Sequence, residues 1–165
     1  MPTPAISTLR RPATLLLVLL MSVVAFAAMA GATSETTARA HAAMLTFRQK
    51  AVVIASYQRG DPYRYGAAGP NAFDCSGLTK FAYAQAGHYL GHSTGAQWSE
   101  TRHIAKRDKR PGDLIFYTSN GRGSGIYHVA LYAGRGYTWV ARHTGTVVQR
   151  QRIYSSRYLV GRVRA

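Results

Sequence analysis

Two segments in the first half of the chain carry apolar residues at helical spacing, which predicts two amphipathic helices. The first runs from about Ala43 to Gln58 and the second from Leu78 to Ala86, and a glycine follows each within two residues. A shorter helix is expected around Gln97-Trp98, because Ser93-Thr94 before it is a suitable N-cap.

After Pro111-Gly112 the pattern changes to short runs rich in β-formers and separated by turns. The spacing Gly134-Arg135-Gly136 is a hairpin signal. Helices followed by strands predict an α+β domain over residues 43–165, with an antiparallel sheet of roughly five strands. The five expected strands are Asp113–Tyr117, Ile126–Ala133, Tyr137–Ala141, Thr146–Gln149 and Tyr158–Val163.

The N-terminus has the pattern of a secretory signal peptide. Arg10 and Arg11 precede an apolar run over residues 15–30, and small residues form cleavage sites at residue 30 and at residue 42. The run is shorter than the roughly 20 residues of a transmembrane helix. We therefore expect a cleaved signal, a flexible leader over 31–42, a secreted protein and no stable membrane span; an uncleaved anchor is the alternative.

The chain is strongly basic, with 21 Lys and Arg against 6 Asp and Glu and a formal charge of +15. Such an excess implies an anionic partner, such as nucleic acid, anionic lipid or an acidic cell-wall polymer. No nucleic-acid motif or stacking platform accompanies the charge, so we expect no nucleic acid and interpret the charge as adhesion.

The only cysteine lies in the sequence Asp74-Cys75-Ser76-Gly77, directly before the apolar positions of the second helix. Cys75 is therefore expected on the first turn of that helix. In the first turn of a helix the backbone N–H groups and the macrodipole favour an anion, which predicts a thiol pKa below about 8.5. A small buried hydrophobe is the alternative. The expected export to an oxidising compartment favours a reactive thiol, because a single cysteine cannot form a disulfide within the chain.

A thiolate nucleophile needs a base, and histidine is the usual one near neutral pH. Of the six histidines, His128 lies within a predicted strand, where alternation places it on one face with Ala130 and Tyr132. A half-buried structural histidine is the alternative. A metal site and a cofactor are not expected, because no ligand set accompanies the single cysteine, and no G-x-S-x-G elbow indicates a serine hydrolase.

Four motifs occur in order over about residues 51–163: Asp61-Pro62-Tyr63-Arg64-Tyr65-Gly66, Asp74-Cys75-Ser76-Gly77-Leu78, the run Arg110 to Tyr117, and His128 to Gly134. In this order and spacing they resemble the NlpC/P60 family of cell-wall peptidases. The resemblance implies a papain-like α+β core, with the cysteine on a helix and the histidine on a facing sheet.

The resemblance also implies roles for individual residues. Cys75 would be the nucleophile and His128 the general base and then acid, while Tyr63 lines the site and can donate to the oxyanion. Asp74 and Ser76 match positions that hold the peptide stem, often its free amine, and Ser93 matches a further pocket serine. A helix-capping Asp74 and a core Tyr63 are the structural alternatives.

The chain departs from the family at a third polar residue, expected about twelve positions after the strand histidine. Val140 occupies this position and cannot accept a hydrogen bond from the imidazole, whose tautomer and orientation the third group normally fixes. His143 is a candidate substitute, but odd spacing in a regular strand turns it to the opposite face. A bulge or a backbone carbonyl are further ways to hold the ring.

The sequence therefore predicts a secreted, monomeric cysteine endopeptidase that cuts peptidoglycan stem peptides at a γ-D-glutamyl bond, as the resemblance implies. Its basic surface would hold it to anionic cell-wall polymers. One alternative is an amidase or acyltransferase that uses the same Cys75 and His128 pair. The other is a catalytically weak wall-binding module, suggested by Val140.

Overall fold

The computed structural model describes residues 45–165. The expected signal peptide, the leader over 31–42 and the first residues of the first predicted helix lie outside this range. Within it, none of the helices combines the length and apolar character that a membrane crossing requires.

Three α-helices form, and a side-chain cap begins each of them. Helix α2 spans Phe47–Tyr57 and starts with a capping box between Thr46 and Gln49. Helix α3 spans Cys75–Gln85 and is capped by Asp74, and α4 spans Thr94–Glu100 and is capped by Ser93. All three helices were expected from the sequence, and each begins at a side chain that accepts a hydrogen bond from its first turn.

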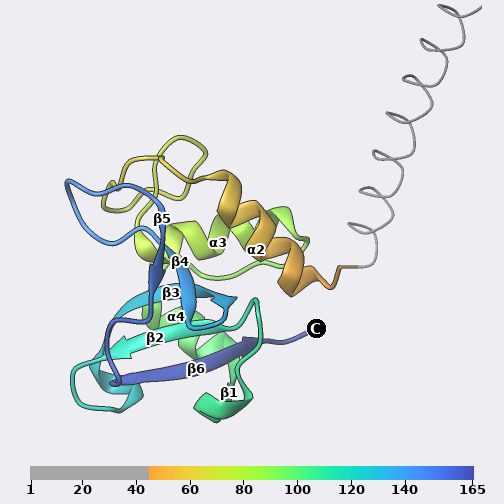
Figure 1. Ribbon diagram of the computed structural model, residues 1–165, viewed down its shortest axis with the longest axis vertical. Helices are drawn as coiled ribbons and strands as arrows, with labels where there is room; N and C mark the ends of the chain where they lie inside the picture. The colour runs from red at the N-terminus through yellow and green to blue at the C-terminus, as the bar shows by residue number, and fades with distance from the viewer. Residues whose placement is uncertain (1–44) are drawn as a thin grey trace, which may run out of the picture. The chain divides into compact units, whose positions relative to one another are not determined.

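Six strands form one antiparallel sheet in the order β1-β6-β2-β3-β4-β5. The protein is therefore α+β, as predicted (Figure 1). Two short 3₁₀ turns, Lys106–Asp108 and Gly123–Gly125, interrupt the connections. The strands are β1 (Thr101–Ile104), β2 (Leu114–Thr118), β3 (Ile126–Gly134), β4 (Tyr137–Val140), β5 (Gln149–Arg152) and β6 (Tyr158–Val163).

The sheet has one strand more than the sequence predicted, and this additional strand is β1. It lies at one edge of the sheet, pairs only with β6, and carries the exposed side chains of Arg102 and His103. A four-residue edge strand buries too little apolar surface to leave a clear period of two in the sequence.

The strand expected over 146–149 lies further along, at β5. The apolar residue that suggested it, Val148, is buried, but its backbone pairs with the loop after α2. Its N–H donates to the carbonyl of Asp61 and its carbonyl accepts from Gly60. Strand β5 itself is Gln-Arg-Gln-Arg and has no apolar residue, so hydrophobicity could not mark it.

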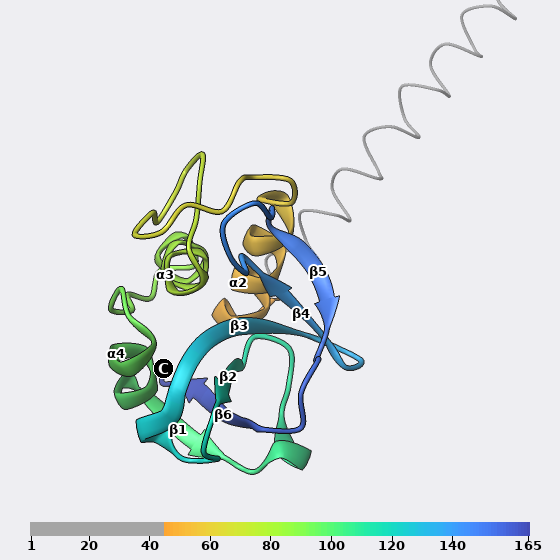
Figure 2. The same cartoon turned by 90° about the vertical axis from the view of Figure 1, so that its left-hand side faces the viewer.

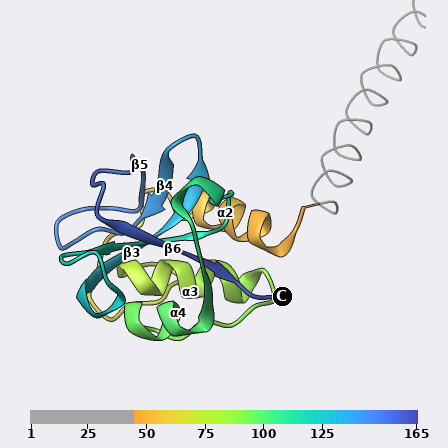
Figure 3. The same ribbon diagram turned by 90° about the horizontal axis from the view of Figure 1, so that it is seen from below.

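The main core lies between the helices and one face of the sheet. Helices α2 and α3 pack together, and α3 and α4 lie on the same side of the sheet (Figures 2 and 3). Alternation along β3 directs Val129 and Leu131 into this core. Other residues buried here include Phe73, Leu78, Tyr83, Leu114, Phe116 and Val148.

The opposite face of the sheet has its own apolar cluster. Ala130 and Tyr132 of β3 contribute to it, as the predicted alternation requires, together with Ile115, Tyr117, Val140 and Val160. The rings of Tyr117 and His128, a directly opposed cross-strand pair, lie 5.7 Å apart. His128 therefore extends from the face that carries this second cluster.

Candidate active site

A cavity of about 430 Å³ opens where the N-terminus of α3 meets the first half of β3. It brings Cys75 and His128 together, although 53 positions separate them in the sequence. Its walls are formed by Tyr63, Tyr65, Gly66, Asp74, Cys75, Ser76, His92, Ser93, Thr94, Tyr127, His128 and Arg142. The cavity thus contains every residue of the predicted site except His143.

The start of α3 is tightly fixed. The Asp74 carboxylate accepts hydrogen bonds from the backbone N–H of Gly77 at 2.6 Å and from the Ser76 hydroxyl at 3.1 Å. Its other oxygen accepts from the N–H of Gly66 at 2.9 Å. A Cβ at position 77 would collide with the backbone carbonyl of Ala67, so only glycine fits here. These contacts place Cys75 at the first helical position, at the cavity wall.

The Cys75 thiol is largely buried, and this burial raises its pKa. A hydrogen bond from the backbone N–H of Val129 opposes the rise, and the nearby Asp74 charge adds to it. The expectation of a lowered thiol pKa was therefore wrong, because desolvation outweighs the helix N-terminus. Cys75 and His128 nevertheless line the same cavity.

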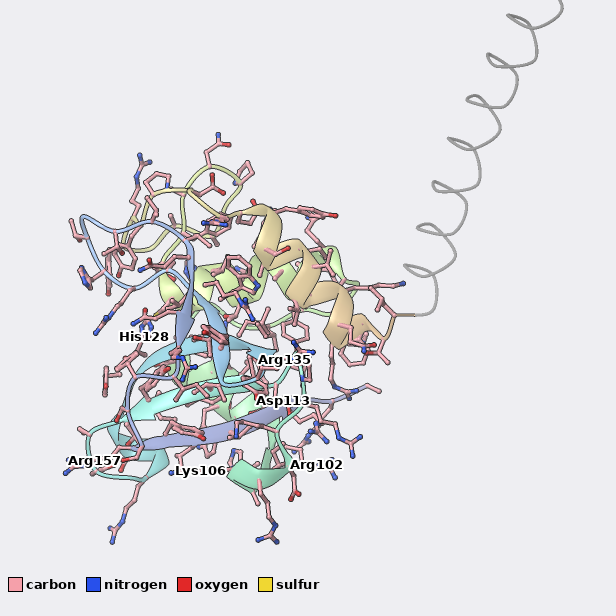
Figure 4. The ribbon with its side chains drawn as sticks, viewed as in Figure 1. Arg102, Lys106, Asp113, His128, Arg135 and Arg157 are labelled. Atoms are coloured by element: carbon pink, nitrogen blue, oxygen red, sulfur yellow. The ribbon has the colours of Figure 1, made fainter. Side chains whose placement is uncertain are left out.

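His128 is buried, with 5% of its surface exposed. Burial lowers its pKa to about 4, and the charges of Arg142 and His143 add to the effect. The imidazole is therefore neutral at neutral pH and able to accept a proton. Figure 4 shows His128 on β3.

Position 140, where the resemblance implies a third polar residue beside the cysteine and histidine, is apolar, as the sequence indicated. Val140 is 2% exposed, in the cluster on the same side of the sheet as His128. Among residues 45–165, no group lies within hydrogen-bonding distance of the buried Nε2 of His128. The ring is thus held by packing on that side.

The structure does not support His143 as the group that orients His128. His143 is exposed, and its Nδ1 lies 2.9 Å from the carbonyl oxygen of Thr144 in its own loop. Its backbone N–H donates to the hydroxyl of Thr146. His143 influences His128 only through charge, because the loop after β4 directs its ring elsewhere.

Tyr63 lies at the cavity wall beside Cys75. Burial raises the pKa of its hydroxyl, and the nearby Cys75 and Asp74 charges raise it further. The hydroxyl therefore stays protonated, as a donor to a developing negative charge must.

Ser76 and Ser93 both line the cavity, but each hydroxyl already has a structural contact. Ser76 donates to Asp74. The Ser93 oxygen accepts from the N–H of Ala96 as the cap of α4, and its own proton stays available. The prediction of Ser93 as an N-cap is therefore confirmed, and Ser93 also lies at the cavity wall.

Sequence reasoning missed His92. Its Nε2 lies 3.1 Å from both oxygens of the Asp74 carboxylate, at the cavity wall. The sequence offered no spacing that joins His92 to Asp74; only its position next to Ser93 could have indicated it.

Sequence reasoning also missed Arg142, although it directly precedes His143. Its guanidinium lies over the ring of Tyr154, 4.5 Å from the centroid, and lines the cavity beside His128. Within residues 45–165, no group of three or more His, Cys, Asp or Glu side chains is placed to hold a metal ion.

Comparison with known proteins identifies relatives over most of the described chain. Residues 60–163 match the NlpC/P60 family. The chain is 41% identical over 114 residues to a protein named probable endopeptidase p60 from Listeria monocytogenes. The match covers 66% of this chain and 22% of the Listeria protein, so it spans only about a fifth of that relative.

Solved structures give the same result. The peptidoglycan hydrolase RipB from Mycobacterium tuberculosis superposes with a TM-score of 0.63 at 28% identity, over 71% of this chain and 64% of that one. RipD from the same organism, described as a non-catalytic NlpC/p60 domain protein adapted to peptidoglycan binding, gives 0.62 at 28% identity. That match covers 72% of this chain and 98% of RipD.

Proposed function

Because the chain belongs to the NlpC/P60 family, whose solved relatives include a peptidoglycan hydrolase, we propose that it is a cysteine peptidase that cuts peptidoglycan stem peptides. One observation carries the proposal: Cys75 at the start of α3 and His128 on β3 line the same cavity. A nucleophile and a base at one cavity are what hydrolysis of an amide requires.

The chemistry begins with both groups neutral. Burial raises the pKa of Cys75 and lowers that of His128, so a thiolate–imidazolium pair is disfavoured in the free enzyme. The proton therefore moves from the thiol to His128 as Cys75 attacks the carbonyl carbon. Because Nε2 is buried, Nδ1 is the ring nitrogen that receives it.

The attack forms a tetrahedral intermediate with a negative oxygen. The Tyr63 hydroxyl and the backbone N–H of Cys75 are the donors available to it, and one such donor is typically worth about 10²–10³ in rate. The C–N bond then breaks, and His128 returns the proton to the leaving amine. Water attacks the thioester, giving its proton to His128; a carboxylic acid leaves and the thiol is restored.

The substrate proposal follows the charge of the cavity. The buried Asp74 carboxylate lies at its wall, with Ser76 and His92 as neighbours, and suits the free amine of a stem peptide. The point of cleavage that we propose is the γ-D-glutamyl bond, as the resemblance to the family implies.

We also propose that the protein acts outside the cytoplasm, with a signal at residues 1–30 removed and 43–165 forming the catalytic domain. The basic surface suits the anionic wall. In Figure 4, Arg102, Lys106, Arg135 and Arg157 are spread around the sheet. A second cavity of about 300 Å³ is lined by Arg48, Arg110 and Arg162. N-terminal sequencing of the protein recovered from culture medium tests the cleavage site.

The deciding experiment uses the purified mature protein and its Cys75→Ala and His128→Ala variants with defined wall fragments. Mass spectrometry should show new amine and acid ends within the stem peptide for the wild type and for neither variant. Separation of peptide from sugar would instead indicate an amidase, and acyl transfer to an added amine would indicate a transferase.

A non-catalytic binding module is the second candidate. It is favoured by one observation: Val140 is apolar and lies on the same face of the sheet as His128, whose Nε2 has no partner in the described part of the chain. The structural relative RipD is described as having this kind of function. Unchanged fragments together with retention on purified cell walls would support it and contradict the peptidase.

A further inference from the structure

The cavity carries opposite charges on two sides of the reacting pair. Asp74 contributes a carboxylate with His92 beside it, on the side of α3. Arg142 contributes a guanidinium from the segment after β4, and it is the only Lys or Arg among the lining residues. The cavity wall therefore provides a place for a cation and a separate place for an anion.

The Arg142 guanidinium is positioned but not paired. It stacks over the ring of Tyr154, which itself stacks at 4.1 Å on the buried Tyr117. Within residues 45–165 no carboxylate lies within ion-pair distance of it. Stacking engages the flat face of a guanidinium and leaves its N–H edges free, which is the geometry that binds a carboxylate through two hydrogen bonds.

This cation lies at an unfavourable place for the free enzyme. The titratable or charged neighbours of His128 are Cys75 from α3, Tyr117 from β2, and Arg142 and His143 from the segment after β4. Arg142 thus opposes the imidazolium that hydrolysis must form. A bound carboxylate would neutralise the guanidinium and remove this opposition.

We propose that Arg142 is a specificity-determining residue that recognises a free carboxylate on the substrate next to the bond that is cut. The inference rests on the proposed peptidase function. A residue linked through its γ-carbonyl keeps its α-carboxylate free, and the residue after the bond can carry a second carboxylate. Amidation of either group removes the charge that Arg142 recognises.

The test compares three stem-peptide fragments: one with both carboxyl groups free, one amidated at the glutamyl α-carboxyl, and one amidated on the residue after the bond. The wild type should cleave the free acid with a kcat/KM about tenfold or more above one of the amidated fragments. The amidated fragment that is cleaved with the lower kcat/KM shows which of the two carboxylates Arg142 recognises. In Arg142→Gln this ratio should fall to near one, and Arg142→Lys should retain part of it.

The ratio separates recognition from other effects. A variant that only disturbed the fold or His128 would slow all three fragments by one factor and leave the ratio unchanged. Arg150→Gln is the matched control, because Arg150 also stacks on a tyrosine, Tyr137 at 4.2 Å, but does not line the cavity. An unchanged ratio in Arg142→Gln, or equal cleavage of all three fragments by the wild type, overturns the inference.

Binding distinguishes this inference from the proposed function. Calorimetry with Cys75→Ala measures affinity for the same fragments without cleavage. Preference for the free acid in Cys75→Ala, lost in the double variant with Arg142→Gln, supports carboxylate recognition even if the wild type cuts nothing. Equal affinity for all three fragments contradicts it, whatever the activity.

Discussion

Val140 occupies the same face of the sheet as His128, and the Nε2 atom of His128 has no hydrogen-bond partner among residues 45–165. In a Cys–His pair a polar group behind the imidazole normally fixes the tautomer of the ring, and removing that group lowers kcat. Here apolar packing alone holds that side of the ring. The degree of catalysis should therefore depend on what occupies position 140.

Replacing Val140 with asparagine should raise kcat. The amide oxygen would accept from Nε2–H and favour the tautomer in which Nδ1 faces the thiol; we expect a gain of about tenfold or more. Val140→Leu, which has the branched shape of asparagine but no polar atom, is the control and should give no gain. Equal rates for the two variants would show that His128 is already oriented.

The His128 pKa should appear in the pH dependence of stability. The folded value of about 4 lies below the value of 6.5 in an unfolded chain. The unfolded state therefore binds more protons between these values, so stability is fully present above pH 6.5 and falls as the pH drops toward 4. The loss should be about 3 kcal/mol. Urea unfolding at pH 7.5 and 4.5 measures it, and His128→Asn should lack this component.

Alkylation of Cys75 should require alkaline pH. Burial and the Asp74 charge raise the thiol pKa, so the rate with iodoacetamide should increase only above the pH at which an ordinary cysteine reacts. Asp74→Asn removes the charge but keeps a good N-cap, so its alkylation profile should move to lower pH. If Cys75 in the wild type is alkylated at a lower pH than free cysteine, the raised thiol pKa is contradicted.

Two helical glycines should respond in opposite ways to alanine. At Gly77 a Cβ meets the carbonyl of Ala67, so Gly77→Ala should cost roughly 1–3 kcal/mol of stability and lower activity. At Gly95 in α4 a Cβ has open space, so Gly95→Ala should be neutral or stabilise by about 0.5–1 kcal/mol. Thermal unfolding of both variants gives the comparison, and similar losses would refute the proposed close approach.

The sequence predicted the α+β class, the Ser93 cap of α4 and the faces of β3, and it offered the Asp74 cap of α3 as an alternative, because capping residues and apolar alternation are local signals. Cys75 and His128 were identifiable as residue types with a chemistry and a place on an element. His92 and Arg142 were not, since their importance comes from contacts with Asp74 and Tyr154 that only folding creates.

The prediction of a lowered pKa for Cys75 was wrong for a related reason. A helix N-terminus can be read from the sequence, but the extent to which the surrounding chain removes water from the thiol cannot. Likewise β5 has no apolar residue, and its place is set by pairing with β4.

The collision that excludes a side chain at Gly77 has a wider consequence. The close approach of the Ala67 carbonyl to Gly77 holds the Tyr63 loop against the start of α3, so Tyr63, Asp74 and Cys75 form one continuous structural unit over residues 63–77. Arg142 belongs to a separate segment between β4 and β5. Exchange of that segment between related chains should therefore change the recognition of a carboxylate by the cavity, while the unit over residues 63–77 is inherited unchanged.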